Sequence, residues 1–296
     1  MPRGCASPTT ARGFITDEYG PYVYEFDRLT GKRLRAFTLS AKFAVSVQSP
    51  IGNNEISGNT SGRVANKGME GLAITPDGRT LVGIMQSPLL QDGGTATGLT
   101  TRIVRIDIRT GATHEYAYPL DNVKFTVSEI LAVNDHEFLV DERDSKGLAD
   151  DSTAVQKKIY KIDLAGAQDV SRISGAANLA AKAVPKILFL DIVTALSSKG
   201  MAGYDVPAKL EGLTFGTDVV IDGSTKHTLY VSNDNDYTAV VANSHHPTGT
   251  VDNPNTVFVF AFADDDLPGY VPQRFHRAHD DDRDGFDDHD DDGRGW

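Results

Sequence analysis

The feature that most constrains the fold is a short hairpin over residues 66–85, NKGMEGLAITPDGRTLVGIM, with a carboxylate just before its first strand. Apolar residues at 72, 74, 81, 82 and 84 flank a Thr-Pro-Asp-Gly-Arg turn, in which proline presets φ and glycine tolerates a positive φ. Two antiparallel strands are therefore expected. The tripeptide Glu-Gly-Leu recurs at 211–213, where it opens a second hairpin that returns over 227–232. This recurrence indicates a repeat architecture.

The rest of the chain repeats the same order of strand, acidic loop, strand and glycine turn, which is the order of parts in a propeller blade. The strands expected outside the two hairpins lie at 13–18, 22–27, 102–108, 127–133, 137–143, 158–164, 187–192 and 256–262. About four units can be counted, so the pattern predicts an all-β fold of the β-propeller class. Residues 44–63 are expected to form a long loop, and 175–184 a helical turn.

The order of several short motifs resembles one known family. These motifs are Asn-x-Gly-x-Glu-Gly-Leu-Ala at 66–73, Pro-Asp-Gly at 76–78, Asp-Glu-Arg at 141–143, Glu-Gly-Leu at 211–213, Asn-Asp-Asn at 233–235, and the landmarks at 17–21 and 267–270. Over residues 12–272 the chain resembles the phytase-like family, often named "esterase-like activity of phytase". The resemblance implies hydrolysis of a phosphate or other ester. It begins inside a blade, so a six-bladed ring that lacks its first blades is expected.

Three regions are expected along the chain. Residues 1–11 are predicted to be a disordered N-terminus, 12–275 the phytase-like β-propeller domain, and 276–296 an acidic disordered tail. The strand at 13–18 has no expected partner upstream. An unpaired blade edge is therefore predicted near 13–27.

The chemistry is expected where strand ends from different blades converge on one mouth. The carboxylates predicted to bind Ca²⁺ there, as hard oxygen ligands do, are Glu18, Glu70, Glu142, Glu211 and Asp234. Of these, Glu70, Glu142 and Glu211 are the predicted catalytic residues. The side chains predicted to bind an anionic substrate are Lys67, Arg143 and Lys209. A metal-bound water attacking a small-molecule ester is the mechanism that such parts would support.

Structural roles stand beside these functional ones. For Glu70 and Glu211, hydrogen bonds that hold one blade to the next are an equally good explanation. For Arg143, an ion pair with a neighbouring carboxylate is expected in preference to substrate contact. The adjacent pair His245 and His246 fits a solvated loop. No Gly-x-Ser-x-Gly motif is present, so no serine nucleophile is indicated. A non-catalytic propeller that binds a protein or a carbohydrate is the alternative function.

The acidic tail matches a calcium loop in its spacing. Positions 1, 3, 5, 9 and 12 of such a loop are filled by Asp280, Asp282, Asp284, Asp288 and Asp291. Gly285 and the carbonyl group of Phe286 fall at positions 6 and 7. A flanking helix and a final glutamate are missing, so an acidic disordered tail and weak Ca²⁺ binding both remain open.

Composition excludes some partners. The formal net charge of −12 argues against nucleic acid, which requires clustered lysine and arginine. No apolar run is long enough to span a bilayer, and residues 1–11 contain no signal-peptide segment. Cys5 is the single cysteine, so no intramolecular disulfide can form. The family resemblance implies an extracellular or periplasmic protein, and the oligomeric state is left open.

Overall fold

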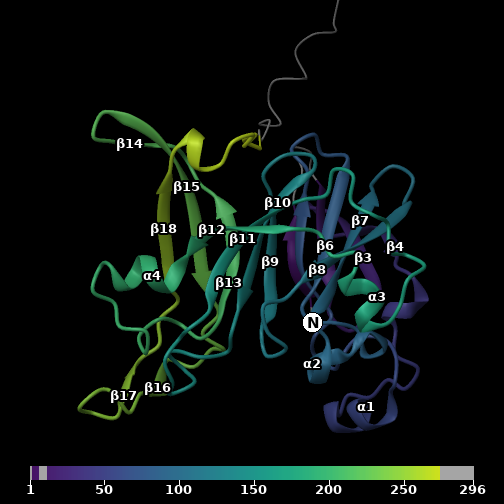
Figure 1. The fold of residues 1–296 in the computed structure, drawn as a ribbon, viewed down its shortest axis with the longest axis horizontal. Coiled ribbons are helices and arrows are strands. Elements are labelled where there is room, and N and C mark those ends of the chain that lie inside the picture. Colours follow the sequence, from purple (N-terminus) through teal and green to yellow (C-terminus); the bar gives the residue numbers. More distant parts are fainter. Residues whose placement is uncertain (1, 7–11, 274–296) are drawn as a thin grey trace, which may run out of the picture.

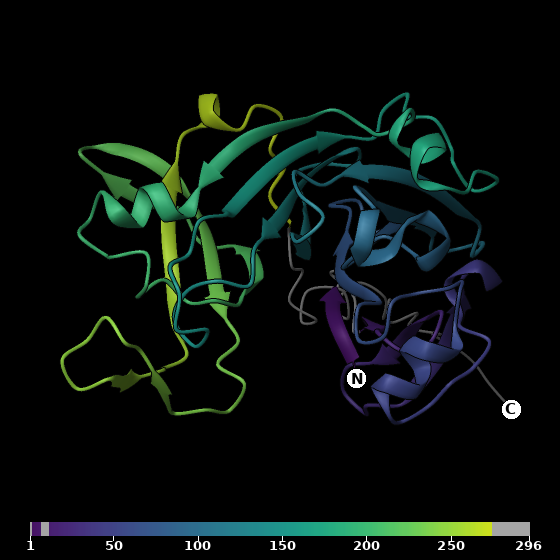
Figure 2. The same cartoon turned by 60° about the horizontal axis from the view of Figure 1, so that its bottom comes forward.

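Four consecutive four-stranded antiparallel sheets make up most of the described part of the chain and are arranged in an arc (Figures 1 and 2). The computed structural model describes residues 2–6 and 12–273. In Figure 2 the arc runs from the purple N-terminal sheet through blue and teal to the green and yellow sheet. Each sheet is called a blade below, numbered 1 to 4 in chain order.

Blade 1 has a strand at its start that the sequence analysis did not expect. It contains β1 (Pro2–Ala6), β2 (Arg12–Asp17), β3 (Tyr22–Asp27) and β4 (Arg33–Thr38), paired in that order. Because β1 pairs antiparallel with β2, the predicted disorder of 1–11 is wrong for Pro2–Ala6, and so is the unpaired edge near 13–27. The backbone groups along this edge of β2 need hydrogen-bond partners, and β1 supplies them.

Blade 2 contains the hairpin predicted over residues 66–85. Its strands are β5 (Met69–Ile74), β6 (Thr80–Met85), β7 (Thr100–Asp107) and β8 (Thr113–Pro119). The turn between β5 and β6 is closed by a hydrogen bond from the Gly78 amide to the Thr75 carbonyl at 2.8 Å, and Gly78 has φ of 70°. The predicted hairpin and its turn chemistry are confirmed.

Blade 3 is again a four-stranded meander. Its strands are β9 (Thr126–Ala132), β10 (Glu137–Arg143), β11 (Lys157–Asp163) and β12 (Lys186–Asp191). The predicted helical turn within 175–184 is α3 (Ala176–Ala180). A further helix, α4 (Ile192–Ser197), follows β12, and the Asp191 side chain caps it by accepting a hydrogen bond from the Thr194 amide.

Blade 4 has three long strands and a short extension. The long strands are β13 (Leu210–Phe215), β15 (Ser224–Asn233) and β18 (Val257–Phe262), and β14 (Val219–Ile221) pairs with the start of β15. A two-stranded hairpin of β16 (Val240–Ala242) and β17 (Thr250–Asp252) lies in the loop before β18. A 3-10 helix at Asp264–Asp266 follows β18.

The remaining helices lie in the loops of blades 1 and 2. They are the 3-10 helices Ala41–Phe43 and Leu90–Asp92 with α1 (Gly52–Gly58) and α2 (Gly94–Thr97). The predicted long loop at 44–63 therefore contains one short helix. No helix in the described ranges is long and apolar enough to cross a membrane.

Three apolar clusters fill the spaces between adjacent blades. Phe14 and Leu72 belong to the cluster between blades 1 and 2, Ile84 and Phe138 to that between blades 2 and 3, and Leu139 to that between blades 3 and 4. The strands β1, β5 and β9 are the first of their blades and lie next to one another. Meander sheets that stack face to face with their first strands together form a β-propeller, so the predicted fold class is confirmed. The six-bladed ring stays a prediction.

Candidate functional site

The strands β5, β9 and β13 are the first strands of blades 2 to 4, and β9 contacts both of the others. The end at which these three strands begin is called the mouth below. In β5 the pairing with β6 skips Glu70, and in β13 the pairing with β15 skips Glu211. Each is therefore the extra residue of a β-bulge. In β9 the pairing with β10 skips Ser128. Ser128, not Glu142, is thus the blade 3 residue equivalent to Glu70 and Glu211.

The glycines near these bulges let the backbones at the mouth approach closely. A Cβ atom on Gly71 would lie 2.7 Å from the Ile130 amide nitrogen, and one on Gly68 would lie 1.9 Å from the Glu18 carbonyl oxygen. Only glycine fits such backbone contacts. The Glu-Gly-Leu motif of blade 2 therefore reflects the packing of β5 against β9.

Arg143, at the end of β10, is the central cation of the mouth. Its side chain is only 6% exposed. It donates from Nε to Ser128 Oγ at 2.7 Å, from Nη1 to the Asp144 carbonyl at 3.3 Å, and from Nη2 to Glu211. The ion pair expected for Arg143 is thus present, and it joins blade 3 to blade 4. Within the described residues, these contacts engage three of the five guanidinium N–H groups.

Lys67 lies in the same group of charges. Burial lowers the pKa of Lys67, and the nearby Arg143 lowers it further, whereas Glu70, Glu18 and Glu211 oppose this. Two cations and three carboxylates from blades 1 to 4 therefore meet at the mouth. The structure brings these five predicted residues together.

A pocket of ≈ 190 Å³ opens beside Arg143. Lys209 and Asp234 line it, together with polar residues of the loops that precede β11 and β16. Lys209 Nζ pairs with Asp236 Oδ1 at 2.6 Å, and both side chains are substantially exposed. Two predicted substrate-binding residues thus share one pocket with a predicted metal ligand.

Glu142 lies at the mouth end of β10, opposite Val127 of β9, but its side chain does not face the other glutamates. Successive side chains of β10 point to opposite faces, so Glu142 faces blade 2 while Arg143 faces blade 4. Glu142 accepts hydrogen bonds from Tyr118 Oη at 2.9 Å and Lys186 Nζ at 2.6 Å. Burial raises the pKa of the Glu142 carboxyl, and Lys186 opposes that shift. The predicted cation shared by Glu70, Glu142 and Glu211 thus lacks the geometry it requires at Glu142.

Lys157 near the mouth was not predicted from the sequence, and neither was the burial of Asp141 in the Asp-Glu-Arg motif. Lys157 is fully buried and donates to Asp144 Oδ1 at 2.6 Å and to the Ala208 carbonyl at 2.8 Å. Desolvation lowers the pKa of Lys157 to about 8. Asp141 is also fully buried, and neither carboxylate oxygen accepts a hydrogen bond from the residues that the structure describes. Desolvation raises the pKa of Asp141 to about 7. Lys157 follows a polar loop in the sequence, and nothing in that local pattern indicates that its side chain is buried.

The described residues offer no ready calcium site. Within 2–6 and 12–273 no group of three or more His, Cys, Asp or Glu side chains is arranged to hold a metal ion. Glu211 is engaged by Arg143, and Asp234 Oδ1 accepts a hydrogen bond from the Asp236 amide at 2.8 Å. The tail carboxylates of the predicted calcium loop lie outside the described residues. Calcium binding therefore stays a prediction.

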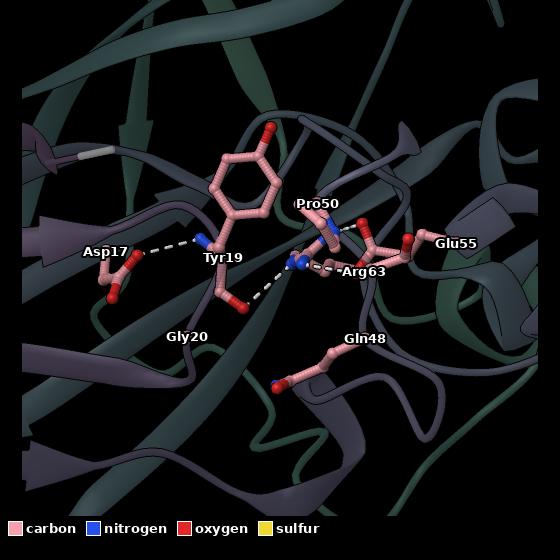
Figure 3. Close-up of a pocket in the computed structure, with 8 residues that line it drawn as sticks. Asp17, Tyr19, Gly20, Gln48, Pro50, Glu55 and Arg63 are labelled. Carbon is pink, nitrogen blue, oxygen red and sulfur yellow. Dashed lines mark hydrogen bonds and ion pairs between the residues drawn. The ribbon is translucent and has the colours of Figure 1, made fainter. Parts of the chain in front are cut away.

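The loop at 44–63 forms a second, shallower pocket of ≈ 430 Å³ near the mouth (Figure 3). Arg63 lies at its wall, where it pairs with Glu55 at 2.8 Å and donates from Nε to the Tyr19 carbonyl at 3.1 Å. The guanidinium group also lies 4.6 Å from the centre of the Tyr19 ring. These contacts fasten the loop to the end of blade 1. We assign them a structural role.

Fold and site together define a β-propeller with a charged mouth. The chain belongs to the Phytase-like family, described as "Esterase-like activity of phytase", whose family model matches residues 4–237. It is also 33% identical over 163 residues to an "Uncharacterized secreted protein" of Arthroderma benhamiae. That match covers 45% of this chain and 32% of the relative, so the chain spans about a third of the relative's length.

The similarity to solved structures is distant, and two of them serve as examples. The β-propeller domain of Myceliophteria thermophila Cps50 (Swd1) has 10% sequence identity and a TM-score of 0.31, with 76% of this chain and 49% of that chain covered. Kuenenia stuttgartiensis hydrazine synthase has 12% identity and a TM-score of 0.34, with coverage of 92% and 68%. Likeness this distant adds nothing to the functional argument.

Proposed function

We propose that the chain hydrolyses an ester whose anionic group binds in the pocket beside Arg143. Membership of the phytase-like family supports a hydrolase. The single observation that carries the proposal is that Arg143 and Lys209, from two different blades, line one small pocket together with Asp234. A volume of ≈ 190 Å³ suits a phosphate group or another compact anion.

The cations of the mouth differ in what they could contribute. Arg143 is fixed by Ser128, Asp144 and Glu211, so it presents its remaining N–H groups in a set direction. Lys209 is paired with Asp236 at the exposed rim, and an incoming anion could exchange with that carboxylate. Arg143 would therefore orient the ester, and Lys209 would strengthen its binding.

Glu70 and Glu211 are the carboxylates that we propose for the chemical step. A water molecule would attack the phosphorus or carbonyl carbon and transfer a proton to one of these carboxylates. The bond to the ester oxygen would break, and the carboxyl group would return that proton to the oxygen, which leaves as an alcohol. Developing negative charge would be stabilised by Arg143. Glu142 faces blade 2 and has no role in this step. If Ca²⁺ binds the mouth, it would supply further charge neutralisation.

We also propose that the protein is extracellular or periplasmic. The support is that the Arthroderma benhamiae relative is described as secreted. A secreted hydrolase would meet small ester substrates outside the cell. Detection of the native protein in the culture medium or periplasm, and its absence from the cytosol, would test this location.

The hydrolase proposal is tested with three esters. Release of p-nitrophenol from its phosphate and its acetate, and of phosphate from phytate, would be measured with Ca²⁺ and with EDTA. We expect turnover of at least one ester. A folded chain that turns over none of them would overturn the hydrolase and favour the alternative, a propeller that binds a protein or a carbohydrate.

The pocket assignment is tested by Lys209→Gln. Loss of an exposed charge contact of about 1 kcal/mol should raise KM for the anionic ester roughly fivefold while kcat changes little. The matched control is Lys199→Gln, because Lys199 is an exposed lysine after α4 that does not line the pocket. If both variants raised KM equally, or if neither did, the substrate would not bind in this pocket.

A further inference from the structure

A larger cavity lies at the opposite end of the blades from the mouth. It has a volume of ≈ 660 Å³ and is lined by residues of β5, β9 and β13, by the loop that follows β13, and by residues 270–273. We call it the floor cavity. Residues 270–273 are held across it by hydrogen bonds from the Val271 amide to the Val133 carbonyl at 2.9 Å and from Gln273 Nε2 to the Ile74 carbonyl at 3.0 Å.

The lining combines an apolar wall with acidic groups. Leu131, Phe215 and Tyr270 supply apolar surface, and the Phe215 and Tyr270 rings lie 4.4 Å apart between centroids. Glu129 and Asp218 are the charged residues of the lining, which among the described residues contains no lysine or arginine. Cavities of this size and character are typical of small-molecule sites, and the charge favours a cation.

The two carboxylates differ in their availability. Asp218 Oδ1 is paired with Nδ1 of His227 at 2.8 Å. Glu129 uses one oxygen, Oε1, to accept hydrogen bonds from the Leu72 amide at 3.1 Å and the Ile130 amide at 2.9 Å. Its other oxygen accepts no hydrogen bond from any residue that the structure describes. The backbone contacts therefore fix the carboxyl group and leave Oε2 for a ligand.

The surroundings of Glu129 favour a positive ligand. Desolvation raises the pKa of Glu129 to about 8, the two backbone amides oppose this, and the carboxylates Asp141 on β10 and Glu70 on β5 raise it further. No lysine or arginine of the described residues is among the principal groups that shift the pKa of Glu129. A positive group at Oε2 would remove this imbalance of charge.

We propose that the floor cavity binds a small organic ammonium compound, with its charged nitrogen at Glu129 and its apolar body against Leu131, Phe215 and Tyr270. The site is separate from the ester pocket, which lies at the other end of the inner strands. The cavity would recognise an amphipathic amine: the carboxylate would bind the ammonium group, and the aromatic wall would contact the hydrocarbon part.

Three probes of one shape test the charge. Binding of 2-phenylethylamine, 2-phenylethanol and phenylacetate to the full chain would be measured by isothermal titration calorimetry. We expect the amine to bind at least about tenfold more tightly than the alcohol, and the acid most weakly, because a charge-assisted hydrogen bond is made only by the amine. Equal affinities, or no binding of the amine at millimolar concentration, would overturn the proposal.

Glu129→Gln tests the residue, because glutamine keeps the shape and an acceptor oxygen but removes the charge. The preference for the amine over the alcohol should disappear in this variant and persist in Asp135→Asn, an exposed acid in the adjacent turn. A preference that survives in Glu129→Gln would overturn the assignment.

If Glu129→Gln does not fold, a measurement on the native chain still tests the role of Glu129. Amine binding should release protons at pH 7, seen as a dependence of the measured heat on the buffer, because the bound amine favours ionised Glu129. Binding without proton release would overturn the role of Glu129.

Discussion

The two faces of blade 3 use the same Asp-Glu-Arg segment in opposite ways. On the face toward blade 2, Glu142 accepts hydrogen bonds from Tyr118, Lys186 and the Asp121 amide. On the face toward blade 4, Asp141 is fully buried and accepts no hydrogen bond from the described residues. The carboxylate toward blade 2 therefore has hydrogen-bond partners. The carboxylate toward blade 4 has none among the described residues, and its burial disfavours the ionised form.

We therefore interpret the face toward blade 2 as a structural contact and the face toward blade 4 as part of the functional region. Lys186 Nζ bridges Glu142 and Asp121 at 2.6 Å and 2.7 Å, and lies 4.1 Å from the centre of the Tyr160 ring. Such a network fixes the loop after β8 to blade 3. On the other face, Asp141 lies close enough to Arg143 and Lys157 for both to lower its pKa, next to the proposed ester pocket. Unsatisfied buried groups of this kind are typical of functional regions.

Breaking the satisfied network should have the largest effect. Lys186→Met leaves the fully buried Glu142 without its cation, so we expect the free energy of unfolding to fall by about 3–5 kcal/mol. Urea denaturation would measure this. The matched control is Lys161→Met, because Lys161 pairs with Glu137 nearer the surface of the same blade, where about 1 kcal/mol or less is expected. Equal losses in both variants would show that the two pairs are energetically alike.

The sequence predicted the elements better than it predicted the site. The β5–β6 hairpin was predictable because its turn residues and apolar residues agree. Blade 3 was misaligned because Ser128 replaces the glutamate of the Glu-Gly-Leu motif, so Glu142 was grouped with Glu70 instead. The burial of Lys157 and Lys186 depends on which strand ends become neighbours in space, and no local pattern encodes that. The hairpin of β16 and β17 was missed because its strands have only three residues each.

Removing the unsatisfied carboxylate should stabilise the protein. The pKa of Asp141 in the folded chain is about 7, above the value of ~3.9 in an unfolded chain. The folded chain therefore holds a proton that the unfolded chain releases, and stability falls as the pH rises from about 4 to 7. Asp141→Asn should weaken this dependence and gain about 1–3 kcal/mol at pH 8.

Denaturant unfolding of both proteins at pH 5, 6.5 and 8 would measure the effect, with Asp135→Asn as an exposed control. Part of the pH dependence should remain in Asp141→Asn, because the pKa of Glu129 is also raised. A variant that is less stable than the native chain at pH 8 would mean that ionised Asp141 is stabilised by Arg143 and Lys157 after all.

The smallest effect is expected at blade 4, where a histidine joins two carboxylates. His227 contacts Asp218 at 2.8 Å and Asp264 at 2.6 Å. Desolvation lowers the pKa of His227, but the hydrogen bonds to Asp218 and Asp264 outweigh it, so the pKa is raised above its ordinary value. The charged histidine therefore stabilises the fold below about pH 6.5, and this contribution is lost as the pH rises through the folded-state pKa.

His227→Gln should thus lower the free energy of unfolding by about 1 kcal/mol or less at pH 5.5, because both carboxylate partners are largely exposed and screened. At pH 9 the histidine is neutral, so no measurable loss is expected. Thermal unfolding at the two pH values would show it. The control is His136→Gln, because His136 pairs with one carboxylate, that of Asp163, in the described part of the chain. This window overlaps that of Asp141 near about pH 6.5 to 7, so the two contributions are separated by comparing the His227→Gln and Asp141→Asn variants. A cost for His227→Gln that is the same at both pH values would mean that the ring stabilises blade 4 by packing against Phe262 and Tyr270 rather than by its charge.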